Sequence, residues 1–448
     1  MYRYDFRERP DRADQPRTWL SPGYINETSQ MIERIAGLRP HPPAWAHDLM
    51  QIARAVYLTD KVSLRAPSVD GWTRDIDLAV ELYDPEPWQP LTSAIGTLLG
   101  VLTSDRWQIS VKRGGPGWQE SFDSSSFRPD EVALFSGGLD STAYLADVAQ
   151  RSSGGPTLLA VSHCHNHDKH AQDRVWPAIV ALASPGRLDR VTFRQLPHVP
   201  PEVRRQHRLG YEGTTRSRGF LLVAAAVYAA AANGVTKVAI PENGQLAVNP
   251  PLSPDRVGGC STRTVHPLSL RMMNDIIRRV GGDVEVYNPL WSYTKVEVCE
   301  IALRSGLGGT DLATTLSCSR ASASQRSRGR HCGCCWACLV RRAALTAVLD
   351  GNDPTTYQSE PWTDQRAERQ AELRALFSWL ETPFTSSDLT KDLRLPSGAP
   401  TQALLGVISR GRTDLLRMLD LLIPPGATRY RAAVERLGDQ LAAVGGPV

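Results

Sequence analysis

Between residues 132 and 304, short apolar runs alternate with longer segments whose apolar residues recur at helical spacing. Such runs are typical of buried strands, and the segments between them are typical of amphipathic helices. The predicted strands are 132–135, 157–162, 189–195, 236–240 and 283–287. The predicted helices are 140–150, 170–183, 217–232, 267–280 and 294–304. This order predicts an α/β fold with a doubly wound, mostly parallel sheet and a site at the carboxyl ends of its strands.

Two further regions flank this core, which we place at residues 129–350. Residues 1–128 are expected to form an appended N-terminal α+β domain, with a loose, charged leader at 8–17 and a boundary rich in glycine and serine at 113–129. Its predicted helices are 44–58 and 90–102, and its predicted strands are 75–83 and 106–112. Residues 351–448 are expected to form a helical C-terminal extension, with amphipathic helices in 363–382 and 400–446.

The first predicted strand of the core runs into Ser136-Gly137-Gly138, and a helix begins near Asp140. Glycines let backbone N–H groups close around an anion, and a helix N-terminus adds unpaired donors and a favourable dipole. The hydroxyls of Ser136, Ser141 and Thr142 supply further donors. The lysine of the Gly-x-x-x-x-Gly-Lys-Ser/Thr loop is missing, so this is a different kind of phosphate loop. The alternative is a strand–turn–helix whose glycines serve only the turn.

A group of cysteines forms the second constellation, with Cys332, Cys335 and Cys338 in two successive Cys-x-x-Cys steps and Cys318 upstream. Soft thiolates at these spacings suit tetrahedral Zn²⁺, and four protein ligands leave no position for water, so the site is predicted to be structural. Cys334 is expected to be a bystander, with an exchange of roles with Cys335 left open. A disulfide framework and redox cysteines are the alternatives, and the scattered remaining cysteines argue against the first.

The run from Phe135 to Thr142 resembles the Ser-Gly-Gly-x-Asp-Ser signature of the N-type ATP pyrophosphatases. Together with the later Cys-Gly-x-Cys-x-x-Cys, the chain resembles the QueC (7-cyano-7-deazaguanine synthase) family over about residues 130–350. The segments 288–297, 215–218 and 338–345 are also similar to stretches of that family. The resemblance implies an adenine nucleotide α-hydrolase-like core that uses ATP and Mg²⁺ and carries a structural Zn²⁺.

The chain departs from the QueC pattern on the side that the resemblance assigns to the acceptor. The family's Tyr-Pro-Asp-Cys-Arg stretch is absent, with 241–244 and 259–264 in its place, and 162–170 replaces the Gly-Gln-x-His segment. Both flanking regions are additions. These departures resemble the longer QueC-like proteins of anti-phage defence operons, the Qat and type IV CBASS systems.

The resemblance assigns roles to individual residues. The ATP-binding set is Phe135, Ser136, Gly137, Gly138, Leu139, Asp140, Ser141, Thr142 and Lys295, of which Ser136, Asp140 and Lys295 are the candidate catalytic residues. Asp140 is expected to bind the metal or order the loop, and Lys295 to offset phosphate charge. The candidate substrate-binding residues are His163, His170, Arg216, Arg218, Glu242, Asn243 and Arg263. For Glu242-Asn243, reading of a purine-like edge and a plain Asn-Gly turn are equally supported, and the histidines are expected to line the site rather than bind a second metal.

The resemblance implies a deazapurine carboxylate, 7-carboxy-7-deazaguanine or a relative, whose carboxyl is adenylated with release of pyrophosphate and then joined to an amine. We predict an amine on a partner protein. The alternatives are ammonia, giving the nitrile preQ0, a tRNA-modifying adenylating enzyme, and a non-catalytic nucleotide-sensing scaffold. The flanking regions would dock the partner or stabilise a homodimer.

The composition of the 448-residue chain limits its possible partners and its cellular location. A net charge of +4 does not require a nucleic-acid partner. The arginines between Asp311 and Asp350 suit either an anionic partner such as tRNA or the negative charge of a zinc tetrathiolate, and we favour the second. The apolar run 220–232 is shorter than the about 20 residues that cross a bilayer, and the N-terminus is polar. We therefore expect a cytoplasmic protein without a membrane partner.

Overall fold

The computed structural model describes residues 1–9, 17–25, 42–115, 117, 127–151, 155–163, 166–214, 216–250, 252, 263–319, 330–364, 366–391, 395 and 398–443. Within these residues the strands form two parallel sheets, one of four and one of five strands. None of the described helices is long and apolar enough to cross a membrane.

The five-stranded sheet is the predicted core. Its strands are β5 (Glu131–Leu134), β6 (Leu158–His163), β7 (Leu188–Phe193), β8 (Lys237–Ala239) and β9 (Glu285–Tyr287). They lie in the order β7-β6-β5-β8-β9, and all neighbours pair in parallel. The strand order therefore reverses at β5, which makes the gap between the carboxyl ends of β5 and β8 the topological switch point. The prediction of a doubly wound parallel sheet is confirmed.

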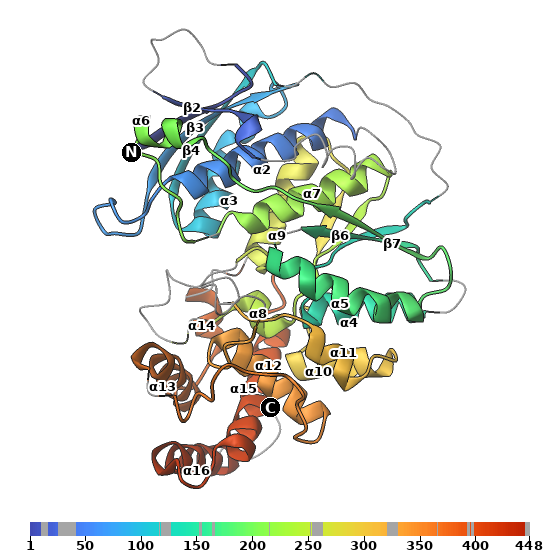
Figure 1. Cartoon of the computed structure of the whole chain (residues 1–448), viewed down its shortest axis with the longest axis vertical. Helices are drawn as coiled ribbons and strands as arrows, with labels where there is room; N and C mark the ends of the chain where they lie inside the picture. The colour runs from blue at the N-terminus through green and yellow to red at the C-terminus, as the bar shows by residue number, and fades with distance from the viewer. Residues whose placement is uncertain are drawn as a thin grey trace.

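Helices cover both faces of this sheet, as Figure 1 shows. The helices α4 (Leu139–Gln150), α5 (Asn166–Leu182) and α10 (Lys295–Arg304) lie on one side, and α7 (Arg218–Ala232) and α9 (Pro267–Arg279) on the other. The alternation along β5 explains both contacts, because Val132 joins the core of the α7 and α9 side while Ala133 joins that of the α4 side.

The N-terminal sheet contains β1 (Tyr2–Phe6), β2 (Thr18–Leu20), β3 (Asp75–Leu82) and β4 (Arg106–Arg113), in the order β2-β1-β3-β4. All three pairings are parallel, and α2 (Ala44–Val62) and α3 (Thr92–Thr103) lie in the connections between strands. The expected α+β arrangement was therefore wrong in type, since parallel strands with crossover helices make an α/β unit. Of the expected leader, residues 10–16 lie outside the described residues.

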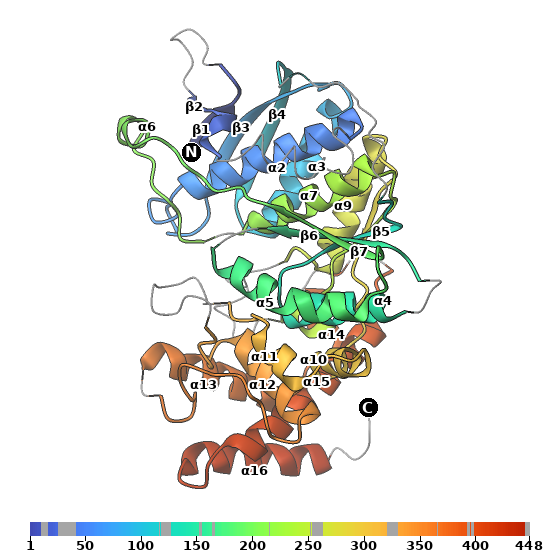
Figure 2. The same cartoon turned by 45° about the vertical axis from the view of Figure 1, so that its right-hand side comes forward.

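The N-terminal helices pack directly on the core. Helix α2 contacts α7 and α3 contacts α9, so one hydrophobic core extends from the N-terminal sheet to one face of the central sheet. Figure 2 shows the same succession of layers as Figure 1, from the N-terminal sheet through two helical layers to the central sheet. The proposed boundary near residue 128 stays a prediction.

The C-terminal region is helical. After α12 (Trp336–Val348), the last helix of the core region, it contains α13 (Ala367–Glu381), α14 (Ser386–Lys391), α15 (Thr401–Leu422) and α16 (Thr428–Ala443). Three short helices, α6 (Pro201–Gln206), α8 (Gly244–Val248) and α11 (Gly309–Thr314), and two 3-10 turns, η1 (Pro22–Tyr24) and η2 (Gln89–Leu91), complete the described elements. Helix α15 packs against α12, α8 and α10, which brings the C-terminal region against the core.

Candidate functional site

The loop between β5 and α4 lies at the switch point. Gly137 has a φ of +75°, and a Cβ there would lie 2.7 Å from the backbone nitrogen of Gln172. Gly138 is the N-cap of α4 and provides no side-chain cap, so the first-turn N–H groups of the helix face the loop. Leu316 donates from its N–H to the Gly137 carbonyl at 2.9 Å, which ties the loop to the segment leading to Cys318.

Hydroxyl groups frame the loop. The Oγ atoms of Ser136 and Ser141 lie 3.1 Å apart, and Ser136 Oγ accepts from the Gly138 N–H at 3.2 Å. Thr142 Oγ1 is buried and has no hydrogen-bond partner among the described residues. Phe135 and Leu139, by contrast, are buried in the hydrophobic core and anchor the two ends of the loop there. The arrangement presents backbone and hydroxyl donors to an anion.

We predict that Gly137→Ala lowers ATP affinity by at least about tenfold, which corresponds to about 1.4 kcal/mol. The added Cβ meets backbone at Gln172 and is strained at positive φ, so the loop itself must move. Isothermal titration calorimetry with ATP measures the effect. Gly186→Ala is the matched control, because Gly186 has a φ of +77° but open space around its Cβ position. Equal ATP affinity in the two variants would contradict this role of Gly137.

Asp140 is the centre of a buried polar cluster beside the loop. Lys295 Nζ donates to Asp140 Oδ2 at 2.7 Å, and Asn243 Nδ2 donates to the same oxygen at 3.0 Å. The three residues come from the first turn of α4, the first residue of α10 and the N-cap of α8. Lys295 and Asp140 are 2% and 5% exposed, so their ion pair is almost entirely desolvated.

The Glu242 side chain completes this cluster, because it lies beside Asp140 and accepts from Asn243 Nδ2 at 3.4 Å. Burial by itself favours a neutral Asp140, but Lys295, Glu242 and Asn243 bring the pKa of its carboxyl below the ordinary value. Burial, with the Asp140 charge added, raises the pKa of Glu242 well above its usual range. Asp140 Oδ1 is buried without a partner among the described residues. Two adjacent carboxyls with a spare oxygen are a donor set that fits Mg²⁺.

Two residues that sequence reasoning missed hold the cluster in place. Gln245 Oε1 accepts from the backbone N–H of Lys295 at 2.8 Å. Asn288 accepts from the Glu242 N–H at 3.1 Å and donates to the Glu242 carbonyl at 2.7 Å. Asn288 stands in the motif-bearing segment 288–297, and this signal was available in the sequence. The place of Gln245 depends on tertiary contacts.

The structure places Glu242 and Asn243 beside Asp140, at the end of the loop between β5 and α4. Asn243 is fully buried, donates to Asp140 and caps α8 by accepting from the Leu246 N–H at 3.1 Å. Both ends of its amide are therefore used within the protein, which agrees with the turn interpretation and gives Asn243 a part in orienting Asp140. The predicted reading of a purine edge by Asn243 finds no support in these contacts.

The other candidate substrate residues are dispersed. His163 ends β6, packs edge-on against Phe193 and is buried, while His170 is exposed on α5. Of the histidine-rich segment, residues 164 and 165 lie outside the described residues. Arg216 stacks on Trp72 at 4.4 Å, so it packs against the N-terminal region. The ring contacts of His163 and Arg216 are therefore with Phe193 and Trp72, outside the Asp140 cluster.

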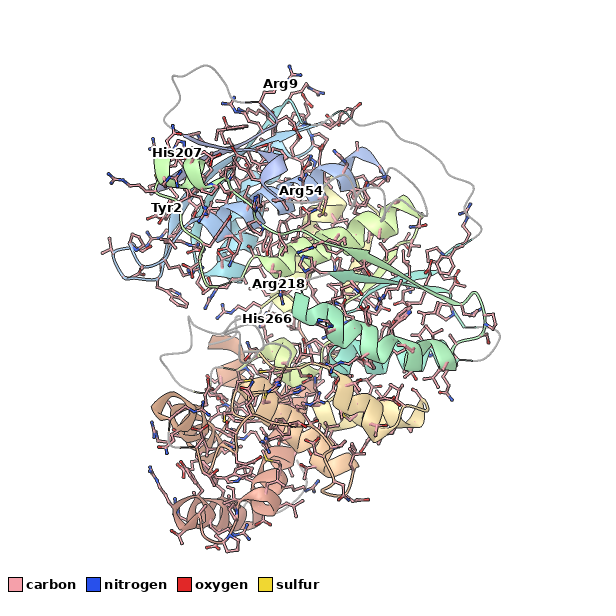
Figure 3. The ribbon with its side chains drawn as sticks, viewed as in Figure 1. Tyr2, Arg9, Arg54, His207, Arg218 and His266 are labelled. Carbon is pink, nitrogen blue, oxygen red and sulfur yellow. The ribbon has the colours of Figure 1, made fainter. Side chains whose placement is uncertain are left out.

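Arg218 and Arg263 lie where α7 and α9 begin. A Cβ on Gly219 would overlap Thr264 Oγ1, so the start of α7 and the segment before α9 are in contact. Figure 3 shows Arg218 and His266, the N-cap of α9, at the level where α5 begins. His266 was missed by sequence reasoning. It is buried, and burial together with Arg263 lowers its pKa to about 4, which keeps the ring neutral.

The four predicted cysteines form one cluster. The Sγ atoms of Cys318, Cys332, Cys335 and Cys338 lie within 4.8 Å of one another. Cys318 and Cys335 are 4.0 Å apart and Cys332 and Cys338 are 3.9 Å apart, close to the about 3.8 Å edge of a tetrahedron with Zn–S bonds of about 2.3 Å. The cluster is compatible with structural zinc.

The local backbone shapes the cysteine cluster. Gly333 has a φ of +85° between two cysteines, and the N–H groups of Cys332 and Cys335 point at Cys318 Sγ (3.4 Å) and Cys332 Sγ (3.3 Å). Cys334 points away, toward Ser359 Oγ at 3.2 Å, so the structure places it outside the cluster.

Two of the arginines expected to offset zinc charge have other partners. Arg341 is fully buried and donates to Thr315 Oγ1 and to the Leu312 carbonyl, both at 2.8 Å. Arg342 pairs with Glu360 and lies 3.7 Å above the ring of Tyr357. The Arg341 contacts hold the segment before Cys318, and the Arg342 contacts hold the segment after the cysteines. Residues 320–329, with three of the arginines in question, lie outside the described residues.

Comparison with known proteins agrees with this geometry. Residues 218–349 match the family model "Queuosine biosynthesis protein QueC". Over 79 residues the chain is 35% identical to a 7-cyano-7-deazaguanine synthase from Cupriavidus pinatubonensis (strain JMP 134 / LMG 1197), an alignment covering 18% of this chain and 31% of the relative. The chain thus matches about a third of that relative's length. The family match contains Lys295 and the four cysteines and begins after the Ser136–Thr142 loop. In this region the chain is QueC-like.

Proposed function

We propose that this protein is an ATP-dependent C–N ligase that adenylates 7-carboxy-7-deazaguanine, or a close relative, and joins it to an amine on a partner protein in an anti-phage defence system. The observation that carries the chemistry is the Asp140–Lys295–Glu242 cluster beside a glycine-rich phosphate loop at the switch point. The QueC match over residues 218–349 supports a deazaguanine substrate. The added flanking regions support a macromolecular acceptor.

The substrate carboxylate must first be activated, because it has no usable leaving group: oxide cannot leave at neutral pH. A carboxylate oxygen of the substrate bonds to the α-phosphorus of ATP, the bond from that phosphorus to the bridging oxygen breaks, and pyrophosphate leaves. The N–H groups of the α4 start and the hydroxyls of Ser136 and Ser141 bind the departing pyrophosphate, and Lys295 offsets its charge. Mg²⁺, held by Asp140 and Glu242, would neutralise phosphate oxygens.

The second step consumes the acyl-adenylate. The amine nitrogen bonds to the acyl carbon, the bond from that carbon to the AMP oxygen breaks, and the nitrogen loses a proton to solvent. The products are an amide and AMP. The departures from the QueC pattern at 163–170 and 241–264 concern the acceptor side, which supports an acceptor other than ammonia.

A second candidate is synthesis of preQ0, in which ammonia is the acceptor and a second activation dehydrates the amide to a nitrile. The match to a 7-cyano-7-deazaguanine synthase favours it. The two candidates share the adenylation step and differ in the fate of the acyl group, so one experiment separates them.

We expect a partner protein to gain the mass of an amide-linked deazaguanine when it is co-expressed with this chain and the proteins encoded beside it. Intact-mass spectrometry measures the gain, and Asp140→Asn should remove it because adenylation stops. Unmodified partners alongside free nitrile product would overturn the ligase proposal and favour preQ0 synthesis.

A further inference from the structure

Helix α15 of the C-terminal region packs immediately behind the residues that orient the Asp140 cluster. A Cβ on Gly411 would lie 2.0 Å from Gln245 Nε2 and 2.4 Å from Gln245 Cδ. Gln245 is 3% exposed, and its Oε1 accepts from the backbone N–H of Lys295 at 2.8 Å. The missing side chain of Gly411 is therefore what leaves room for this contact.

A second contact from α15 reaches the first turn of α10. Arg410 pairs with Glu297 at 2.7 and 3.2 Å and donates to the Ser292 carbonyl at 2.9 Å. Glu297 is the N3 residue of a capping box, in which it accepts from the Thr294 N–H at 2.8 Å. Lys295, the first residue of α10, lies between Thr294 and Glu297 in the sequence. Arg410 thus holds the first turn of α10, which carries Lys295, through Glu297 and the Ser292 carbonyl.

We propose that α15 is a positioning element of the ATP site, in which Gly411, through Gln245, and Arg410, through Glu297, fix the Lys295 ammonium on Asp140. The inference rests on the proposed function for its catalytic consequence. Neither Gly411 nor Arg410 touches the reacting groups. Gly411 acts on the Lys295 backbone through Gln245, and Arg410 acts on the same helical turn through Glu297. Because displacement by about 1 Å can cost on the order of 10²-fold in rate, two such supports matter for catalysis.

The test compares Gly411→Ala with Gly406→Ala, one and a half turns earlier on the same helix. Alanine should favour the helix by about 1 kcal/mol at either position, but at Gly406 its Cβ makes only an ordinary contact, 3.5 Å from Arg410 Nη1. We expect Gly411→Ala to lower the kcat of pyrophosphate release by on the order of 10²-fold with a smaller change in KM for ATP. Gly406→Ala should match the unsubstituted protein.

Gln245→Ala supplies the second arm, because it removes the group that Gly411→Ala displaces. If the proposal is right, Gly411→Ala has little further effect in the Gln245→Ala background, which is non-additivity in a double-mutant cycle. Arg410→Lys should retain more kcat than Arg410→Ala, because lysine keeps one ion pair with Glu297. An equal loss from Gly411→Ala in both backgrounds, or wild-type kcat for Gly411→Ala, would overturn the proposal.

A readout without turnover separates this proposal from the function on which it rests. Lys295 is 2% exposed, so an amine-reactive reagent should label it slowly, and faster once its backbone support is displaced. Mass spectrometry should show faster labelling of Lys295 in Gly411→Ala and no change in Gly406→Ala. Unchanged labelling in both variants would count against α15 as a positioning element. Absence of pyrophosphate release by the unsubstituted protein would refute the proposed function, while labelling still decides the part of α15.

Discussion

Replacing Asp140 with asparagine is expected to reduce ATP-dependent pyrophosphate release by on the order of 10³-fold or more, with a deazaguanine carboxylate as substrate. The substitution removes the charge that orients Lys295 and the carboxylate that would help to hold Mg²⁺. A coupled pyrophosphate assay, together with chromatographic detection of AMP, measures the loss. We expect a comparable loss for Asp140→Ala and a loss for Ser136→Ala.

Asp140→Asn is the more informative variant because it should fold. Removing one partner of a buried ion pair usually leaves an uncompensated charge that costs about 3–5 kcal/mol. Here Glu242 stands beside the pair, and burial, with the Asp140 charge added, raises its pKa. Without that charge Glu242 can ionise and pair with Lys295, so the melting temperature should change little. Asp140→Ala lacks the hydrogen-bonding amide and should melt earlier.

Asp147→Asn on the same helix is the matched control. Asp147 forms an exposed i,i+4 pair with Arg151, and such surface pairs contribute little to stability. This variant should keep full activity. Phosphate release without AMP would contradict adenylation, and an Asp140→Asn variant with normal rates would remove Asp140 from the mechanism.

The sequence alone was sufficient for the central sheet because its strands contain buried apolar residues and a helical pattern separates each strand from the next. β1 and β2 were not predicted. Tyr2–Phe6 alternates aromatic and charged residues at the chain start, and Thr18–Leu20 is only three residues long. The parallel pairing of the N-terminal sheet also depends on contacts between distant segments, such as Tyr4 with Leu78. Local patterns do not contain such information.

The candidate site likewise contains residues that the sequence predicted and residues that it did not. The loop was predictable because its glycines and hydroxyls form a local motif, and the four clustered cysteines because their spacing suits a metal site. Lys295 was predictable from the resemblance of segment 288–297 to the QueC family. Gln245 contacts Lys295 across 50 residues, and Gly411 and Arg410 contact segments more than a hundred residues away, which no local pattern encodes. The role of Arg216 in substrate binding stays a prediction, and the structure adds a contact that its motif did not indicate, the stacking of its guanidinium on Trp72.

Removal of the structural zinc is expected to unfold the segment around the four clustered cysteines. Structural zinc in small domains binds with an apparent free energy of about 10–16 kcal/mol, comparable with the about 5–15 kcal/mol that separates folded from unfolded proteins. We therefore expect about one zinc per chain by elemental analysis. Cys335→Ala and Cys318→Ala should lose the metal, together with solubility or several degrees of melting temperature.

Cys334→Ala is the control that distinguishes metal binding from a general intolerance of substitution. Cys334 is as buried as the proposed ligands, but its thiol points toward Ser359 and lies outside the cluster. This variant should keep its zinc, with a modest loss of stability from the small cavity. A folded and active preparation without zinc would refute the tetrathiolate site, and zinc loss in Cys334→Ala instead of Cys335→Ala would exchange their roles.

Loss of zinc should also weaken ATP binding by the loop between β5 and α4. Leu316, two residues before Cys318, donates its N–H to the carbonyl of Gly137, and Arg341 holds the same segment through Thr315. A chelator strong enough to remove the metal should therefore lower ATP affinity before global unfolding, because the loop loses this support while the sheet beneath it persists. Titration of ATP during stepwise chelation, with circular dichroism on the same samples, measures both events. Simultaneous loss of ATP binding and helical signal would show that the cysteine cluster and the core unfold as one unit.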